Sequence, residues 1–409
     1  MLVHSTRLIR RALAAGIFIL CGLRAGNAKI LTVGQPGTPC PGAQYGTISA
    51  AIHAAAPHDV IAICPALYNE QLTITEPLTL RGVRVNGISR VLVQPAVLST
   101  ISGVAAVITV MDAADVVIEN LAIDAGNNSV TGCTPGLAAV HYLNASGTLR
   151  GNAIFGAKLQ DAQSCTEFFG NGFGVLLETD GAAPGPFCVW VTHNSIHDFT
   201  RNGIEAQGTG LNARIEDNSI AGPGPASGSL QFGVYILNGA IGEVRRNSIN
   251  EGTCGSLSVD SCINLRSEGV ALRAAGDGTI VEQNTITNAQ SGIFINGGSH
   301  THISRNLIRN IDALDAIDIQ GTITGAFSDS IIEGNTIVNT TLPAFSCGIA
   351  EAPGTGVAGN RIVGNTVSDA YCGVAFVSTD RVEGNKYLNT LYDTINAEQT
   401  PVPPPATEP

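Results

Sequence analysis

The sequence predicts an all-β solenoid in which short parallel strands and turns stack coil upon coil. One pattern recurs as GVYILNGAIGEVRRNSI from Gly233, GVALRAAGDGTIVEQNTI from Gly269 and GIFINGGSHTHISRNLI from Gly292. Self-similarity with a period of about 20 to 40 residues is typical of stacked-repeat proteins. Each copy holds two stretches of alternating apolar residues, and the Gly/Asn/Ser turns between them leave no room for a helix.

A recurring asparagine, two residues before an aliphatic or aromatic side chain, indicates the register of these repeats. In-register parallel stacking places identical side chains about 4.8 Å apart, so asparagine amides can hydrogen-bond into a ladder. Asparagine also tolerates the left-handed backbone of a tight corner. We therefore assign a structural role to Asn120, Asn152, Asn194, Asn218, Asn247, Asn284, Asn306, Asn335, Asn365 and Asn385.

The N-terminal part carries a second recognisable pattern. It contains a Tyr and a Thr, an Ala-rich stretch, a D-x-I strand, a P-x-x-Y-x-E motif and an L-x-L-x-G strand, which fall on Tyr45, Thr47, Ile48 to Ala56, Asp59 to Ile61, Pro65 with Tyr68 and Glu70, and Leu78 to Gly82. With these motifs the chain resembles a right-handed parallel β-helix of the pectin-lyase-like superfamily, from about Ile30 to Leu391. The resemblance implies one domain of about ten or eleven coils behind a short N-terminal capping helix. It says little about activity, because the superfamily holds lyases, hydrolases, esterases, epimerases and non-enzymes.

Composition agrees with a solenoid. Charged residues make up 13% of the chain and glycine accounts for 48 of 409 residues, against about 25% and about 7% in ordinary globular proteins. The net charge of −12 argues against a nucleic-acid partner. It also disfavours an anionic polymer, unless cations or local basic residues help.

Residues 1–28 have the pattern of a secretory signal peptide. Arg7, Arg10 and Arg11 precede the apolar stretch Ala12 to Gly22, and a small-residue cleavage site ends at Ala28. This stretch is shorter than the roughly 20 apolar residues of a membrane anchor. We therefore expect a secreted or periplasmic monomer that inserts in no membrane, with a β-helix domain at residues 29–397 and a Pro-rich disordered tail at 398–409.

Cysteine spacing suggests disulfides, which suit an exported chain. Cys133 and Cys165 occupy matching places in successive coils, and Cys254 and Cys262 enclose one long insertion, so we predict both pairs to be bonded. Cys40 and Cys64 flank the capping helix.

Cys347 and Cys372 each precede a coil-starting glycine and should stack about 5 Å apart. They fit a disulfide and two buried thiols equally well. No C-x-x-C motif or Cys/His cluster with ligand spacing occurs, so we predict no metal site of that kind.

Candidate functional residues lie on the outer face of the Gly-started strands. Strand alternation turns Val234, Val270 and Ile293 into the core, so every second residue points outward. A mixture of carboxylates, amides, an arginine and exposed aromatic rings resembles a sugar-binding groove, although scattered surface residues would give a similar list. The predicted substrate-binding residues are His141, Gln207, Tyr235, Phe294, Asn296 and Asp318, and the predicted catalytic residues are Glu205, Glu178 and Arg273.

Long corner insertions and the spacing of two carboxylates indicate which part of this face forms the site. The linkers that end at Gly174, Gly233 and Gly269 are long and should wall the groove between His141 and Arg273. Glu178 and Glu205 come from adjacent coils and are offset by two residues, which places their Cβ atoms about 8 Å apart. Inverting glycoside hydrolases hold their two carboxyl groups about 6.5 to 9.5 Å apart. Arg273 would bind an acidic substituent or act as a lyase base.

The sequence lacks the residues that several enzyme activities of the superfamily require. The N-T-D, D-D and G-H-G signatures of polygalacturonase-like hydrolases are missing, as is the W-G-R strand of pectin methylesterases. No acidic cluster flanks Arg273, as pectate lyases would require. Calcium is a weaker possibility at Asp312, Asp315 and Asp318, where a turn with two solvated aspartates and one strand carboxylate is the simpler interpretation.

Two classes of function stay open from the sequence. One is a lyase or glycoside hydrolase that binds or degrades an extracellular polysaccharide or cell-surface glycan. The other is a non-catalytic binding or structural solenoid, or a periplasmic accessory protein. A clustered acid, base and cation site would favour the first, and a flat, evenly polar face the second.

Overall fold

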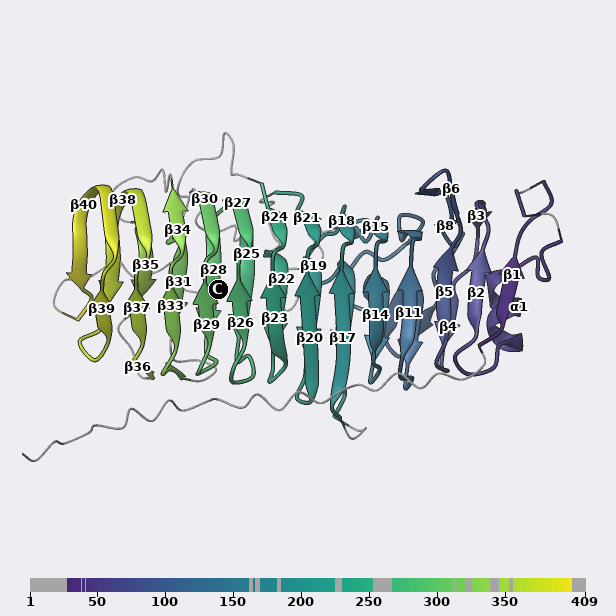
Figure 1. Ribbon diagram of the computed structural model, residues 1–409, viewed down its shortest axis with the longest axis horizontal. Helices are drawn as coiled ribbons and strands as arrows, with labels where there is room; N and C mark the ends of the chain where they lie inside the picture. Colours follow the sequence, from purple (N-terminus) through teal and green to yellow (C-terminus); the bar gives the residue numbers. More distant parts are fainter. Residues whose placement is uncertain are drawn as a thin grey trace, which may run out of the picture.

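The coils of this protein stack along one axis, from the N-terminal to the C-terminal end of an elongated molecule (Figure 1). The computed structural model describes residues 28–37, 39–40, 42–161, 165, 170–181, 185–224, 230–252, 267–311, 314–320, 326–338, 346–352 and 356–398. Nearly all regular structure in these residues is parallel β-strand. The predicted fold, a right-handed parallel β-helix, is confirmed.

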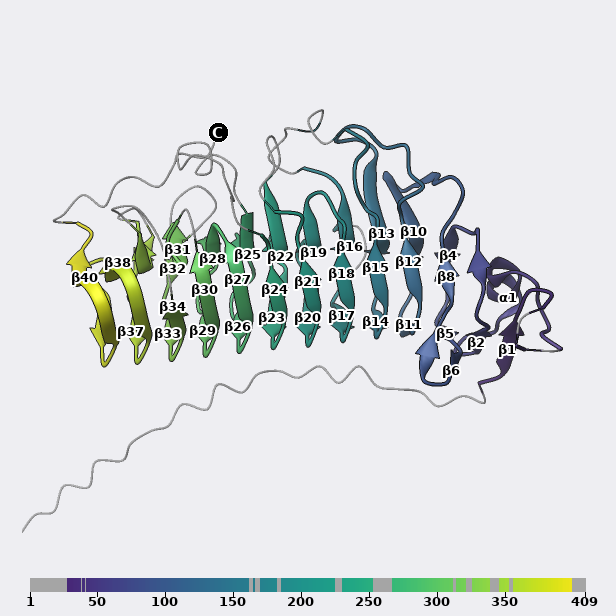
Figure 2. The same ribbon diagram turned by 90° about the horizontal axis from the view of Figure 1, so that it is seen from above.

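Three long parallel sheets form the sides of the helix, and Figure 2 shows sheets A and B on its opposite sides. Sheet A consists of thirteen strands, which are β1 (Ile30–Val33), β2 (Val60–Ile63), β5 (Thr79–Gly82), β11 (Val116–Glu119), β14 (Gly147–Arg150), β17 (Phe187–Thr192), β20 (Leu211–Glu216), β23 (Ile241–Arg245), β26 (Ile280–Glu282), β29 (His302–Ser304), β33 (Ile331–Glu333), β37 (Arg361–Val363) and β39 (Arg381–Glu383).

Sheet B carries the predicted site. Its strands are β4 (Leu72–Ile74), β10 (Val104–Met111), β13 (Gly136–Leu143), β16 (Phe173–Glu178), β19 (Asn202–Gln207), β22 (Gln231–Leu237), β25 (Ser267–Arg273), β28 (Ser291–Asn296), β31 (Ile317–Gln320), β35 (Cys347–Glu351) and the second half of β38 (Thr366–Phe376).

Sheet C consists of β3 (Leu67–Tyr68), β8 (Leu92–Val93), β12 (Ala122–Asp124), β15 (Ala153–Phe155), β18 (Ser195–His197), β21 (Ser219–Ala221), β24 (Ser248–Asn250), β27 (Thr285–Ala289), β30 (Leu307–Ile311), β34 (Thr336–Val338) and the first halves of β38 and β40 (Lys386–Asn396). The second half of β40 pairs with the second half of β38 and so continues sheet B. The remaining short strands are β6 (Arg84–Val85), β7 (Ile88–Ser89), β9 (Thr100–Ile101), β32 (Phe327–Ser328) and β36 (Val357–Ala358).

Aliphatic columns fill the interior. Val234, Val270 and Ile293 are fully buried and pair in register on neighbouring strands of sheet B, so the inward direction predicted from strand alternation is confirmed. The glycine that precedes each of these residues is required by packing. A Cβ atom at Gly269 would lie 2.4 Å from Cγ2 of Ile286 and 2.7 Å from the carbonyl oxygen of Gly292.

The asparagine ladder runs through the corner between sheets A and C. Nδ2 of Asn247 donates to Oδ1 of Asn284 at 3.0 Å and to the carbonyl of Ile215 at 2.8 Å, and Oδ1 of Asn247 accepts from Nδ2 of Asn218 at 3.0 Å. The same pattern repeats in Asn152, Asn194, Asn218, Asn247, Asn284, Asn306, Asn335, Asn365 and Asn385.

Asn120 was wrongly assigned to this ladder. Leu121 occupies the ladder position there, and its amide donates to Oδ1 of Asn152 at 3.0 Å. Asn120 has φ of 59°, and the residue before each ladder asparagine also has positive φ, such as His193 or Arg246. The left-handed corner is therefore one residue earlier than predicted, because the ladder side chain must point inward.

The capping helix α1 (Ile48–Ala54) covers the N-terminal end and stops two residues earlier than predicted. The hydroxyl of Thr47 accepts the amide of Ala50 as an N-cap. The Glu70 carboxylate accepts the amides of Ile48 and Ser49, both at 2.8 Å, so it binds the positive end of the helix dipole.

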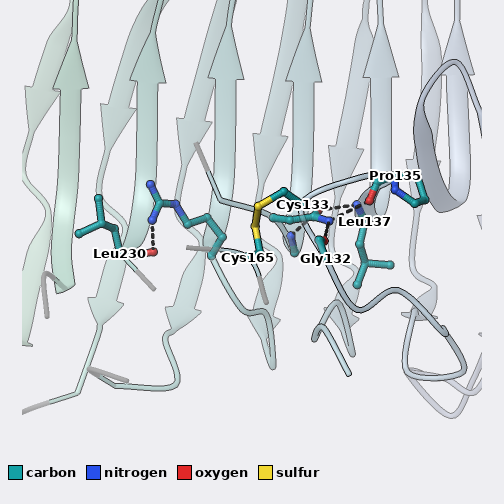
Figure 3. Close-up of a disulfide and its surroundings, with 9 residues drawn as sticks. Gly132, Cys133, Pro135, Leu137, Cys165 and Leu230 are labelled. Atoms are coloured by element: carbon teal, nitrogen blue, oxygen red, sulfur yellow. Dashed lines mark hydrogen bonds between the residues drawn. A yellow bond between two sulfur atoms is a disulfide. The ribbon is translucent and has the colours of Figure 1, made fainter. Parts of the chain in front are cut away.

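Disulfides fasten neighbouring coils. The predicted bond between Cys133 and Cys165 is present, with Cα atoms 4.8 Å apart, beside the loop that contains Gly132 and Pro135 (Figure 3). Cys347 and Cys372, left open by the sequence, are bonded and face each other on β35 and β38, and a third bond joins the cysteines that flank the capping helix. The predicted pair Cys254 and Cys262 lies outside the described residues. Such bonds are compatible with a secreted protein.

We predict that Asn247→Ala lowers the free energy of unfolding by about 2–4 kcal/mol, because it leaves buried donors and acceptors of Asn218, Ile215 and Asn284 unpaired. Urea unfolding followed by circular dichroism measures the change. Asn250→Ala is the matched control, since Asn250 is an exposed asparagine on β24, and should cost less than about 1 kcal/mol. Equal losses in the two variants would contradict a stabilising role for the ladder.

Candidate functional site

The outer face of sheet B carries three columns of residues in register. The central column contains His141, Leu176, Glu205, Tyr235, Ala271, Phe294 and Asp318, and beside it lie Glu178, Gln207, Leu237, Arg273, Asn296 and Gln320. On the other side lie Phe173, Asn202, Phe232, Glu268 and Ser291. The structure thus brings the predicted site residues together on neighbouring strands.

These side chains are much less exposed than the sequence suggested. Tyr235 is 2% exposed and Phe294 4% exposed, and His141, Asn296 and Asp318 are also buried. The expectation of exposed aromatic rings on this face was wrong, because the rings pack on one another. Phe232 and Tyr235 have ring centroids 4.5 Å apart, within an apolar cluster that also contains Leu237, Ala271 and Phe294.

Glu178 is the partly exposed carboxylate of the face, with 21% of its side chain accessible. Its Oε1 lies 2.8 Å from Nε2 of the buried His141, and its Oε2 accepts Nε2 of Gln207 at 2.9 Å. Both oxygens of Glu178 are therefore held by neighbours on adjacent strands. This arrangement orients the carboxylate.

Glu205 is in a different environment, with only 5% exposure. Burial raises its pKa to about 7, although the charge of Arg201 and a hydrogen bond from Asn202 act against the shift. The negative charge of Glu178 raises it further. Glu205 therefore keeps its proton up to about neutral pH.

The two glutamates also have the predicted offset. Leu176 pairs with Glu205, and Glu178 pairs with Gln207, so the carboxyl groups lie on adjacent strands, two residues apart. A protonated carboxyl beside an oriented carboxylate is the combination that general acid–base catalysis uses.

Sequence reasoning missed three members of the cluster, namely Arg201, Asn202 and Glu268. Arg201 is almost fully buried, its Nη1 donates to the carbonyl of Leu230 at 2.7 Å, and its guanidinium lies 5.0 Å from the ring centroid of Phe232. Burial lowers the pKa of Arg201 to about 10, opposed by the charges of Glu205, Tyr235 and Glu268.

These residues precede the glycine that was used to mark the start of each strand. Asn202, Phe232 and Glu268 each stand one position before it and share one column. Strict alternation from Tyr235 would turn Phe232, three residues earlier, toward the core, so the strand pattern does not predict that this column lies beside Tyr235 on the outer face.

Arg273 lies at the C-terminal end of β25, where its side chain hydrogen-bonds Tyr235. Burial raises the pKa of Tyr235, whereas the positive charges of Arg273 and Arg201 lower it. The phenol therefore stays protonated at neutral pH. Within the cluster the charge of Arg201 is favoured by Glu268 and opposed by the like charge of Arg273.

Asp315, one of the two turn aspartates expected to be solvated, is only partly exposed. Burial and the charge of Asp318 raise the pKa of Asp315, and its Oδ1 accepts the amide of Cys347. Asp318 is buried and accepts Nε2 of Gln320 at 3.1 Å. Asp312 lies outside the described residues, and within them no group of three His, Cys, Asp or Glu side chains could hold a metal ion.

A surface hollow lies away from this face. It has a volume of about 570 Å³ and is lined on sheet A by Arg305, Glu333, Gly334, Val363, Gly364, Glu383 and Gly384. The hollow forms where glycines replace longer corner side chains. The adjacent carboxyl groups of Glu178 and Glu205 lie on sheet B, so we place the candidate chemistry there.

Comparison with known proteins identifies the family. Residues 127–322 and 268–387 match the right handed beta helix region family. The chain belongs to this family. No curated protein matches the sequence, and within the described residues no helix has the length and apolarity needed to cross a membrane.

Solved structures are similar to this chain at low sequence identity. A GH136 lacto-N-biosidase from Eubacterium ramulus is 12% identical with a TM-score of 0.51, covering 88% of this chain and 68% of that one. A mannuronan C-5 epimerase A-module from Azotobacter vinelandii is 15% identical with a TM-score of 0.47, covering 83% and 93%. The Dettilon tailspike protein is 14% identical with a TM-score of 0.44, covering 81% and 62%.

We predict that wild type loses stability relative to Glu205→Gln as the pH rises from about 4.5 to 7. The folded protein binds a proton at Glu205 that the unfolded chain has already released in this range, so unfolding is favoured as the pH rises. A shift from 4.5 to about 7 corresponds to a change on the order of 3 kcal/mol. Urea midpoints at pH 5 and pH 8 measure it.

Glu216→Gln is the matched control for this pH effect, because Glu216 lies on sheet A in a surface ion pair with Arg246. If wild type and Glu205→Gln keep a constant stability difference between pH 5 and pH 8, Glu205 does not hold its proton.

Proposed function

We propose that this chain is an exported protein that binds and hydrolyses an extracellular polysaccharide on the outer face of sheet B. The unlike environments of Glu205 and Glu178 on adjacent strands carry this proposal. Glu205 would supply a proton at neutral pH, and Glu178 is a carboxylate oriented by His141 and Gln207.

Each residue then has a defined role. Glu205 donates its proton to the glycosidic oxygen as the bond to the anomeric carbon breaks. Glu178 accepts a proton from the water that attacks this carbon from the opposite side. The offset on adjacent strands corresponds to a Cβ separation of about 8 Å, which leaves room for that water and favours inversion of configuration.

Substrate would approach from the side of Glu178 and Arg273, the less buried column of the face. Glu205 is only 5% exposed, so the sugar must displace covering side chains before its glycosidic oxygen reaches the acid. Arg273 would bind an acidic or polar substituent, and Asn296 and Asp318 would contact hydroxyl groups further along the stack. The proposal includes export through residues 1–28 and a monomeric protein.

A second function is favoured by the burial of Tyr235 and Phe294. Both rings are packed into the apolar cluster on sheet B rather than presented for stacking on a sugar. In that case the protein is a non-catalytic solenoid, and the charged cluster only stabilises the face. Turnover separates the two functions.

We expect wild type to release reducing ends from at least one member of a polysaccharide panel. Glu205→Gln, which keeps the shape of the side chain but cannot donate a proton in the same way, should lower kcat by about 10²- to 10⁴-fold. Glu178→Gln should lower it similarly. A reducing-end assay does not distinguish hydrolysis from elimination, so the ultraviolet absorbance of unsaturated products is recorded in parallel to detect lyase activity.

Glu216→Gln on the neighbouring strand β20 is the matched control and should keep full activity. Full activity in both Glu205→Gln and Arg273→Ala would place the site elsewhere. Unsaturated products would replace the hydrolytic mechanism by a lyase mechanism. Binding without turnover across the panel would leave the non-catalytic solenoid as the function.

A further inference from the structure

Trp190 is the single tryptophan of the chain and lies on the outer face of sheet A, in β17. It is 45% exposed, in contrast to the aromatic rings that are packed together on sheet B. One exposed aromatic residue is common on protein surfaces. The residues around Trp190 indicate that its exposed ring is part of a binding surface.

The indole ring is supported from one side. The guanidinium of Arg214 lies 5.5 Å from the ring centroid, a cation–π contact with the residue that pairs with Trp190 on β20. The same guanidinium forms ion pairs with Glu216 and Glu243, both at 3.3 Å. Arg214 is therefore held in place, and with it the orientation of the ring.

A shelf of short side chains lies on the other side of the ring. On the preceding strands the positions that pair in this column are Thr148, Val117 and Thr79. None of them reaches as far from the sheet as an indole. The ring therefore stands at the end of a flat surface that extends over three strand spacings, about 14 Å.

Basic residues border this shelf. Arg81 and Arg150 both bind the buried Glu119, and Arg84 hydrogen-bonds Oδ1 of Asn120. Burial raises the pKa of Glu119, but the two arginines outweigh this effect and hold it below its usual value. Arg81 and Arg150 are about half exposed, and each has five N–H donors, so they can bind other acceptors as well.

Three guanidinium groups against one carboxylate make a local positive surface on a chain whose net charge is −12. We propose that this shelf is a second glycan-binding surface, which takes an acidic polysaccharide. A sugar ring stacks on Trp190, and carboxylate groups of neighbouring sugars bind Arg150 and Arg81.

The geometry suits a chain that runs across the strands, along the axis of the stack. Arg150 is one strand and two residues from Trp190, about 8 Å away, and Arg81 lies two strands beyond Arg150, about 10 Å further. Sheet A, which carries this surface, lies on the opposite side of the stack from sheet B (Figure 2), and Glu205 is on β19 of sheet B. It rests on the proposed function only in that the ligand is a polysaccharide, and it would hold a polymer without cleaving it.

The single tryptophan makes this site directly observable. Titration of the whole protein with polygalacturonate or alginate should change the fluorescence of Trp190 saturably, and added salt should weaken the effect. A neutral soluble xyloglucan should bind at least about fivefold more weakly. Glu205→Gln should show the same titration as wild type, because it lies on sheet B.

Variants are compared by isothermal calorimetry with the polyuronate that binds best. Trp190→Ala should weaken binding by about tenfold or more, and Trp190→Phe, which keeps a ring, should weaken it less. Arg150→Gln should weaken binding by about fivefold or more, whereas the matched control Arg361→Gln, on β37 of the same sheet, should bind like wild type.

Each result decides the inference. No fluorescence change with either polyuronate, or unchanged affinity in Trp190→Ala, overturns it. Equal affinity for xyloglucan together with unchanged affinity in Arg150→Gln contradicts the proposal that the ligand is acidic. Tryptophan-dependent binding without any turnover would disprove hydrolysis on sheet B while supporting this surface, so failures of the two proposals can be told apart.

Discussion

In-register parallel hydrogen bonding is the constraint on which the rest of this structure depends. Each coil repeats the one before it about 4.8 Å further along the axis, so a residue type must suit the same position many times. Inside, this requirement gives aliphatic columns and the buried asparagine ladder. Outside, it means that each side chain is surrounded mainly by the residues above and below it in its column, which therefore set its chemistry.

The two main faces use this constraint differently. On sheet A, alternating charges such as Arg245 and Glu282 pair across strands at the surface, where each pair stabilises the fold by little. On sheet B, charged residues lie among Phe232, Tyr235 and Phe294 in a largely dry layer. Burial there keeps Glu205 protonated at neutral pH, while Glu178 stays partly exposed. These different environments are the reason we propose proton transfer on sheet B and binding on sheet A.

The sequence allowed the fold to be predicted because its anchors have strict physical causes. A Cβ atom at Gly233 or Gly292 would collide with an isoleucine of the same coil and with the backbone of the next, so glycine marks the start of each strand. The ladder asparagines point inward and recur with the coil. Asn120 was misplaced because asparagine also suits the left-handed corner residue just before the ladder, and the sequence does not distinguish these two uses.

The sequence predicted which way the side chains of the candidate site point, but not how deeply they are buried. Strand alternation correctly turned Glu205 and Tyr235 outward, yet it does not show whether other residues cover an outward side chain. Arg201 and Glu268 were missed for a related reason, since they precede the glycine that marks the strand. The shift of the Glu205 pKa depends on this three-dimensional packing, which the strand pattern alone does not reveal.

The protonation state of Glu205 tests the account most directly. Protein labelled with ¹³C at the glutamate carboxyl carbon can be titrated by NMR, with Glu205→Gln used to assign the signal. We expect one carboxyl signal that titrates near pH 7 and is missing from the variant. If the signal lost in Glu205→Gln titrates near pH 4.5, the outer face of sheet B is not dry, and the proposed acid does not hold its proton at neutral pH.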